Sequence, residues 1–324
     1  MSDWLQLLGG LILLYFGAEW FVAGGAALAL ALRVPQLLVG LTIVAYGTSA
    51  PEVVVGIEAA LSGHGQVALG NVVGSNIANL GLILGVAVLL RPARVDGALR
   101  QREVPMLLAS AAVVPLLLRD AAISRAEGLA LLLIAFGYTA WMVYRGRDPK
   151  ARSAARADTV AAEEAADAAG APSPGGVPRA LLTAIGGLLV LLIGGQLFVS
   201  AAVAVAQALG MSERLVGLTI VALGTSLPEL VTSAIAARRG HSALAVGNVV
   251  GSNIFNTFLC LGAAAAARPL TGPLELLPVD LGGLFLLTAF GALILRSART
   301  IPRIEGVLLL LLYGGFVITT IAGG

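Results

Sequence analysis

The sequence has few charged residues, a single cysteine and little net charge, and each shortage excludes a class of protein. Only 12% of the 324 residues are charged, whereas soluble domains carry about 25%. The single cysteine, Cys260, excludes an internal disulfide framework. The net charge of +2 gives no indication of a nucleic-acid partner, and we expect none. These shortages leave an integral membrane protein as the expected class.

Apolar residues dominate the composition, with 58% hydrophobic residues and a mean hydropathy of +0.95. They gather in segments close to the length of about 20 residues that crosses a bilayer as a helix, and they lack the strict alternation of barrel strands. We therefore expect an all-α membrane protein with ten transmembrane helices, in contact with the lipid bilayer. The ten segments are 4–31, 37–61, 67–90, 103–120, 127–144, 180–208, 215–237, 243–266, 276–295 and 304–321.

The basic residues predict the orientation of these segments. With both termini outside, 16 of the 20 Lys and Arg residues fall on the cytoplasmic side, as they do in most membrane proteins. Five segments precede the central connection, so the second half enters the membrane upside down. We expect two inverted five-helix repeats, 1–144 and 180–324, joined by a cytoplasmic linker at 145–179, in the cell (inner) membrane. Inverted repeats are typical of secondary transporters, whose site lies at the midplane.

One stretch of the sequence occurs twice. Residues 40–85 and 217–262 align without a gap and share 29 of 46 residues. Each copy carries one glutamate in otherwise apolar sequence, Glu52 in the first and Glu229 in the second. Acidic residues inside a membrane span are costly, and they usually mark an ion or substrate pathway.

A proline precedes each glutamate and predicts a broken helix. Pro51 and Pro228 lack the N–H donor and clash with the carbonyl four residues earlier. A break at membrane depth is tolerated where it lines a polar cavity or is buried in protein. It also exposes carbonyl oxygens, for which Ala45 and Ala222 are candidates. Carbonyl oxygens are good ligands for hard cations.

The polar side chains around the two breaks all offer oxygen atoms. Oxygen-only sites suit hard cations such as Ca²⁺ and Na⁺ rather than zinc or copper. The two carboxylates together would neutralise one divalent ion, and an empty charged site could not easily reorient in the membrane, which favours antiport. The candidate side chains are Thr48, Ser49, Glu52, Ser75, Asn76, Asn79, Thr225, Ser226, Glu229, Ser252, Asn253 and Asn256.

The repeated motifs resemble a known family. GTSAPE with GNVVGSNIAN, and GTSLPE with GNVVGSNIFN, resemble the two α-repeats of the sodium/calcium exchanger family, within the cation/Ca²⁺ antiporter superfamily. The resemblance implies Na⁺/Ca²⁺ antiport by alternating access, usually about three Na⁺ for each Ca²⁺. It also implies that ten of the side chains listed above, all but Asn76 and Asn253, form a shared Na⁺ and Ca²⁺ site with the carbonyls of Ala45 and Ala222.

One position in that motif varies within the family. At the place of Asn256 some relatives have Asp, which is associated with potassium dependence in one branch, so Asn256 favours a potassium-independent exchanger. Three alternatives stay open. A Ca²⁺/H⁺ antiporter would use the same scaffold, a cation channel would line a pore with its ligands, and an intramembrane enzyme would use the paired carboxylates as acid and base. We expect no enzyme activity, no cofactor beyond the transported ions and no obligatory protein partner.

Overall fold

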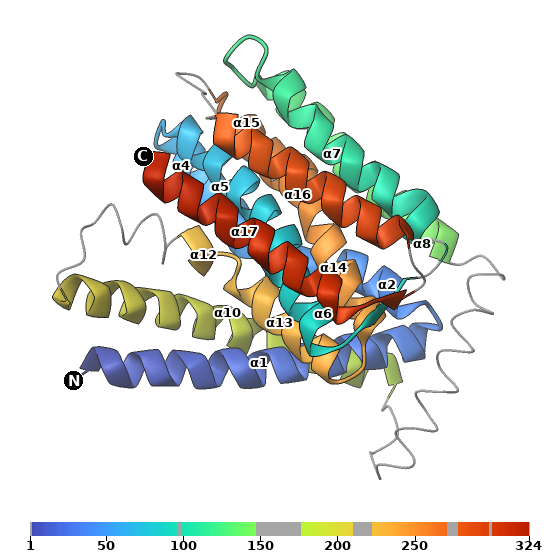
Figure 1. Ribbon diagram of the computed structural model, residues 1–324. Helices are drawn as coiled ribbons and strands as arrows, with labels where there is room; N and C mark the ends of the chain where they lie inside the picture. Colours follow the sequence, from blue (N-terminus) through green and yellow to red (C-terminus); the bar gives the residue numbers. More distant parts are fainter. Residues whose placement is uncertain are drawn as a thin grey trace.

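The computed structural model describes residues 2–95, 97, 99–146, 176–209, 222–270, 278–297 and 300–323. These residues are almost entirely helical, with one short pair of strands (Figure 1). Five-residue π-helical segments (η) interrupt several helices. The elements are α1 (Ser2–Leu32), α2 (Gln36–Val39), η1 (Gly40–Val44), α3 (Ala45–Thr48), α4 (Ala50–Leu61), α5 (Gly65–Ala78), η2 (Asn79–Ile83), α6 (Leu84–Leu90), β1 (Ala93–Arg94), η3 (Leu99–Glu103), α7 (Val104–Leu117), α8 (Arg125–Gly146), α10 (Gly176–Ala208), α12 (Ala222–Gly224), α13 (Leu227–Arg238), α14 (Ser242–Phe255), η5 (Asn256–Cys260), α15 (Leu261–Ala267), α16 (Pro278–Ser297), β2 (Thr300–Ile301) and α17 (Arg303–Gly323).

The expected all-helical fold is confirmed, but fewer than ten helices in the described residues are long and apolar enough to span a membrane. Within the described ranges, seven helices are long and apolar enough to cross a membrane. An eighth is obtained if Gln36–Thr48 and Ala50–Leu61, which meet at a bend of 43°, count as one broken span. The predicted fourth segment falls short because α7 has only 14 residues. In the predicted seventh segment, residues 215–221 lie outside the described residues, as does most of the linker at 145–179.

Helices α1 and α10 lie side by side along one edge of the molecule (Figure 1). Glycines form their contact. A Cβ atom on Gly10, Gly17 or Gly24 would lie 2.3–2.6 Å from backbone nitrogen atoms of α10, those of Phe198, Leu191 and Ala184. As the residue number rises along α1, it falls along α10, so the two helices are antiparallel. Only glycine permits such a close approach of two backbones.

Both repeated stretches break their helix before the glutamate, as the prolines predict. In the first copy α3 ends at Thr48 and α4 begins at Ala50. In the second copy α12 ends at Gly224 and α13 begins at Leu227. Each proline occupies the first turn of the new helix, where its missing N–H costs nothing. The unwound part is only one residue long in the first copy and two in the second.

The later parts of the two copies pack in a reciprocal way. Helix α6 of the first copy contacts α17, near the C-terminus, while α15 of the second copy contacts α8, in the N-terminal half. The segments that connect the helices also pair across the two halves. Ala93 of β1 pairs with Ile301 of β2, and Ile123 pairs with Leu270. Each half is therefore completed by elements of the other.

Candidate cation site

The two glutamates lie at the centre of the molecule, each in the first turn of the helix that follows a break. Glu52 belongs to α4 and Glu229 to α13, and both side chains are fully buried. Ser49 and Ser226 occupy the breaks themselves and are also buried. Each serine hydroxyl is directed at the glutamate of the other copy.

Hydrogen bonds join the two copies reciprocally. The Ser49 hydroxyl lies 3.0 Å from Glu229 Oε1, and the Ser226 hydroxyl lies 3.1 Å from Glu52 Oε1. Ser49 also lies 3.1 Å from the Ser252 hydroxyl, and Ser226 lies 3.1 Å from that of Ser75. Each contact recurs with the two copies exchanged, which is the pattern of a two-fold relation between them.

Several fully buried polar atoms of this cluster have no hydrogen-bond partner among the described residues. They include Glu52 Oε2, Glu229 Oε2, Asn256 Nδ2 and both polar atoms of the Asn79 amide. Buried polar atoms are normally paired, because an unpaired one loses its water without compensation. The unpaired oxygens among them, Glu52 Oε2, Glu229 Oε2 and Asn79 Oδ1, are atoms of the kind that a hard cation binds.

The remaining predicted ligands are the backbone carbonyls of Ala45 and Ala222 and the side chain of Thr225. The Ala45 carbonyl accepts the Ser49 N–H at 3.0 Å and lies 3.5 Å from the Thr48 hydroxyl. A carbonyl oxygen has two lone pairs. The Ser49 N–H uses one of them, so the Thr48 hydroxyl would compete with an ion for the other. Ala222 begins α12. Thr225, the remaining predicted ligand, is partly exposed and lies 3.4 Å from the Asn71 amide oxygen.

The donor set indicates the kind of ion. The predicted ligands provide two carboxylates and otherwise neutral oxygen atoms. No group of three or more His, Cys, Asp or Glu side chains that could hold a metal occurs in the part of the chain that the structure describes. Oxygen donors of this kind favour Ca²⁺ and other hard cations. Two negative charges balance one divalent ion, or two monovalent ions or protons.

Sequence reasoning missed two features of this site. The first is the π-helix that begins at Asn79 in the first copy and at Asn256 in the second. Such wide turns are frequent at functional sites. The second is a pair of asparagines, Asn71 and Asn248, which contact the threonine of the opposite copy. The signal for this pair was present, because both fall in the repeated GNVVGSN motif.

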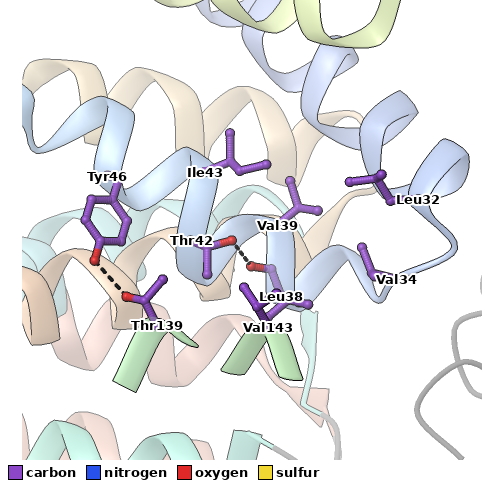
Figure 2. A pocket seen from close by; sticks show the side chains of 9 residues that line it. All are labelled: Leu32, Val34, Leu38, Val39, Thr42, Ile43, Tyr46, Thr139 and Val143. Atoms are coloured by element: carbon purple, nitrogen blue, oxygen red, sulfur yellow. Dashed lines mark hydrogen bonds between the residues drawn. The ribbon is translucent and has the colours of Figure 1, made fainter. Parts of the chain in front are cut away.

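A cavity of about 740 Å³ lies elsewhere, between the end of α1, the α2–η1 segment and α8. Figure 2 shows its mostly apolar lining, with Tyr46 hydrogen-bonded to Thr139 at one end. Its residues are Leu32, Val34, Leu38, Val39, Thr42, Ile43, Tyr46, Thr139 and Val143. It contains no carboxylate. This cavity therefore contains none of the predicted ligands and is separate from the candidate cation site.

Fold and cluster together define a membrane transporter for a hard cation. The family model described as "Sodium/calcium exchanger protein" matches residues 2–144 and 179–322, and the chain belongs to this family. It is thus a cation/Ca²⁺ antiporter.

Individual relatives agree. The chain is 31% identical to the sodium/calcium exchanger MaX1 of Methanosarcina acetivorans, over 98% of this chain and 97% of the relative. It is 36% identical to the inner membrane protein YrbG of Escherichia coli, over 81% of this chain and 79% of the relative. A structure of the sodium-calcium exchanger NCX_Mj, soaked with Na⁺ and Ca²⁺, matches with a TM-score of 0.81 at 31% identity, covering 99% of this chain and 98% of the other.

Proposed function

We propose that this protein exchanges Na⁺ for Ca²⁺ across the membrane by alternating access, at one site shared by both ions. The observation that carries the proposal is the reciprocal cluster around Glu52 and Glu229. Two buried carboxylates, each hydrogen-bonded to the serine of the opposite copy, offer oxygen ligands whose two negative charges balance one Ca²⁺. The names of MaX1 and NCX_Mj, both sodium/calcium exchangers, support Na⁺ as the counter-ion.

The proposed ligands are those expected from the sequence. We infer that Thr48, Ser49, Glu52, Ser75 and Asn79 act with Thr225, Ser226, Glu229, Ser252 and Asn256, and with the carbonyls of Ala45 and Ala222. Eleven of these twelve residues, all but Ala222, are named in contacts or unpaired buried atoms of the cluster, or lie fully buried within it. Uncompensated carboxylates at membrane depth are costly, so the site reorients only when cations or protons occupy it. That requirement couples the two fluxes.

We propose further that the chain forms two inverted five-helix repeats, 1–144 and 180–324, with ten spans, both termini outside and a cytoplasmic linker. The antiparallel contact of α1 and α10, which are the first helices of the two halves, supports this proposal. The two blocks matched by the family model fall in the two halves. Inverted repeats would place the cluster at the midplane, where it can be reached from either side in turn.

The deciding experiment is ⁴⁵Ca²⁺ uptake into proteoliposomes that contain the full chain. Uptake is measured under an outward Na⁺ gradient, under a pH gradient without Na⁺, and with no gradient, and Glu52→Gln serves as the inactive control. We expect uptake only under the Na⁺ gradient. Uptake driven by the pH gradient alone would instead establish Ca²⁺/H⁺ exchange, in which the two carboxylates cycle between protonated and Ca²⁺-bound forms. Uptake without any counter-gradient would establish a channel.

A further inference from the structure

We propose that Asn71 and Asn248 are positioning residues of the cation site. Each asparagine accepts the hydroxyl proton of the threonine in the opposite copy and holds the backbone of the glutamate in its own copy. The inference deepens the proposed function, because it concerns the same site and rests on that site binding a cation.

Asn248 lies on α14 and is fully buried. Its Oδ1 atom accepts a hydrogen bond from the Thr48 hydroxyl at 3.1 Å. Its Nδ2 group donates to the Ser233 hydroxyl at 2.9 Å and lies 3.5 Å from the Glu229 carbonyl oxygen. Three of the four hydrogen-bonding positions of this amide are therefore directed at α13 or at the opposite break.

Asn71 makes the same two contacts in the first copy. Its Oδ1 atom accepts the Thr225 hydroxyl at 3.4 Å, and its Nδ2 group donates to the Glu52 carbonyl oxygen at 3.4 Å. The third contact is missing, because Gly56 occupies the place of Ser233. Asn71 is also partly exposed. The two asparagines thus have one arrangement, which is tighter around Asn248.

The chemistry of cation binding explains why these contacts matter. A hydroxyl binds a cation through a lone pair, so its proton must go to another acceptor. For Thr48 the alternatives are the Val44 carbonyl at 3.1 Å and the Ala45 carbonyl at 3.5 Å. A proton on Ala45 would occupy an oxygen that is itself a proposed ligand. Asn248 provides an acceptor that leaves the Thr48 hydroxyl oxygen and the Ala45 carbonyl oxygen available to the ion.

The same contacts set the spacing between the two copies. Through one amide, Asn248 links the hydroxyl of Thr48 in one copy to the backbone of Glu229 in the other. The spacing of oxygen atoms around a cation determines which ion fits. Loss of the amide should therefore weaken ion binding more than it slows the movement of the loaded protein.

The test uses the full chain and the variants Asn248→Leu, Thr48→Val and the double variant. Leucine keeps the approximate shape of asparagine without its hydrogen bonds. Two quantities are measured: the concentration of Ca²⁺ that gives half-maximal uptake in proteoliposomes, and the rise in Tm that Ca²⁺ produces in detergent. We expect Asn248→Leu to raise the half-maximal concentration about tenfold, with a much smaller change in maximal rate. The half-maximal concentration of the double variant should be close to that of the more affected single variant, because both substitutions remove the same hydrogen bond, from Thr48 to Asn248.

Asn253→Leu is the matched control. Asn253 lies on the same helix and is also buried, and among the described residues its Nδ2 group donates only to the Val249 carbonyl of that helix, at 2.8 Å. Its effect should add to that of Thr48→Val. If Asn248→Leu does not fold, Asn71→Leu with Thr225→Val tests the same coupling at the partly exposed position. Additive effects, or a lower Tm with unchanged Ca²⁺ dependence, would overturn the proposal. The Tm shift needs no counter-ion, so this outcome is independent of whether Na⁺ drives transport.

Discussion

Residues 40–85 and 217–262 place their glutamates, serines and π-helices at matched positions, yet their surroundings differ. Thr48 is fully buried at the first break, whereas Thr225 is partly exposed at the second. Helix α4 ends at Leu61 and is followed by Ser62, whereas α13 ends at Arg238 and is followed by Arg239.

The arginines create a contact that only one half has. Arg238 and Arg239 both form ion pairs with Glu19 of α1, and Arg238 donates a hydrogen bond to the Tyr15 hydroxyl at 2.8 Å. The position of Glu19 in α10 is taken by Gln196. If alternating access exchanges the roles of the halves, a fully symmetric chain would have equal free energies in its two access states. On that mechanism the cluster would keep the symmetry between the two copies, and the flanks would make the free energies of the two access states unequal.

The largest effect should come from the shared centre. Glu52→Gln and Glu229→Gln should each lower ⁴⁵Ca²⁺ uptake at least about 100-fold, since removing one charge from a buried ionic cluster costs about 3–5 kcal/mol. The control is Glu58→Gln, because Glu58 is exposed and its counterpart is Ile235. Normal uptake by either of the two glutamate variants would show that the copies do not share one site.

The next largest effect should come from substitutions of the glycines between α1 and α10. A Cβ on Gly187 would lie 2.3 Å from the Phe21 nitrogen, while a Cβ on the neighbouring Gly186 meets no atom within 4 Å. Gly187→Ala should therefore lower the free energy of unfolding by about 1–3 kcal/mol, as should Gly17→Ala on the partner helix. Thermal unfolding in detergent measures this, with Gly186→Ala as the control. Equal behaviour of Gly186 and Gly187 would contradict the close contact.

The Glu19 ion pairs test the difference between the halves directly. Glu19→Gln should remove only about 1 kcal/mol of stabilising free energy, because the arginines are half exposed and solvent screens the ion pairs. The loss should fall on one access state, so the ratio of uptake rates under opposite Na⁺ gradients should change several-fold. Gln196→Glu, at the matching position, should leave the ratio nearly unchanged. A proportional change in both directions would show that the ion pairs only hold the fold together.

The smallest effect concerns two matched histidines. His241 precedes α14 just outside its span and contacts Gln36 at 3.2 Å, whereas His64 is exposed. Burial, and then the charges of Arg239 and Arg91, lower the pKa of His241. Its folded pKa is below its unfolded pKa, so its contribution to stability is complete above the unfolded pKa of about 6.5 and is lost as the pH falls through the folded pKa. His241→Gln should flatten the Tm profile between pH 7 and 5, roughly the range of that titration, and His64→Gln should not.

The sequence predicted the parts of the site whose chemistry is local. A proline within an apolar helical segment frees a carbonyl and weakens the helix, and a glutamate there usually marks an ion or substrate pathway, so Pro51 and Glu52 indicated both the bend and the candidate site. The π-helix at Asn79 was not predictable, because wider turns have no residue signature. The bond from Thr48 to Asn248 and the ion pairs of Glu19 join residues far apart in the chain, and periodicity carries no information about such pairs.

The exchange of contacts between the halves also has a consequence for how the protein is made. Ser226 and Ser252, which complete the surroundings of Glu52 and Ser49, are synthesised long after the first half has entered the membrane. Until then the newly inserted helices hold a carboxylate and its hydroxyls with none of their later partners. A chain that ends in the central linker would therefore leave Glu52 and Ser49 without these partners.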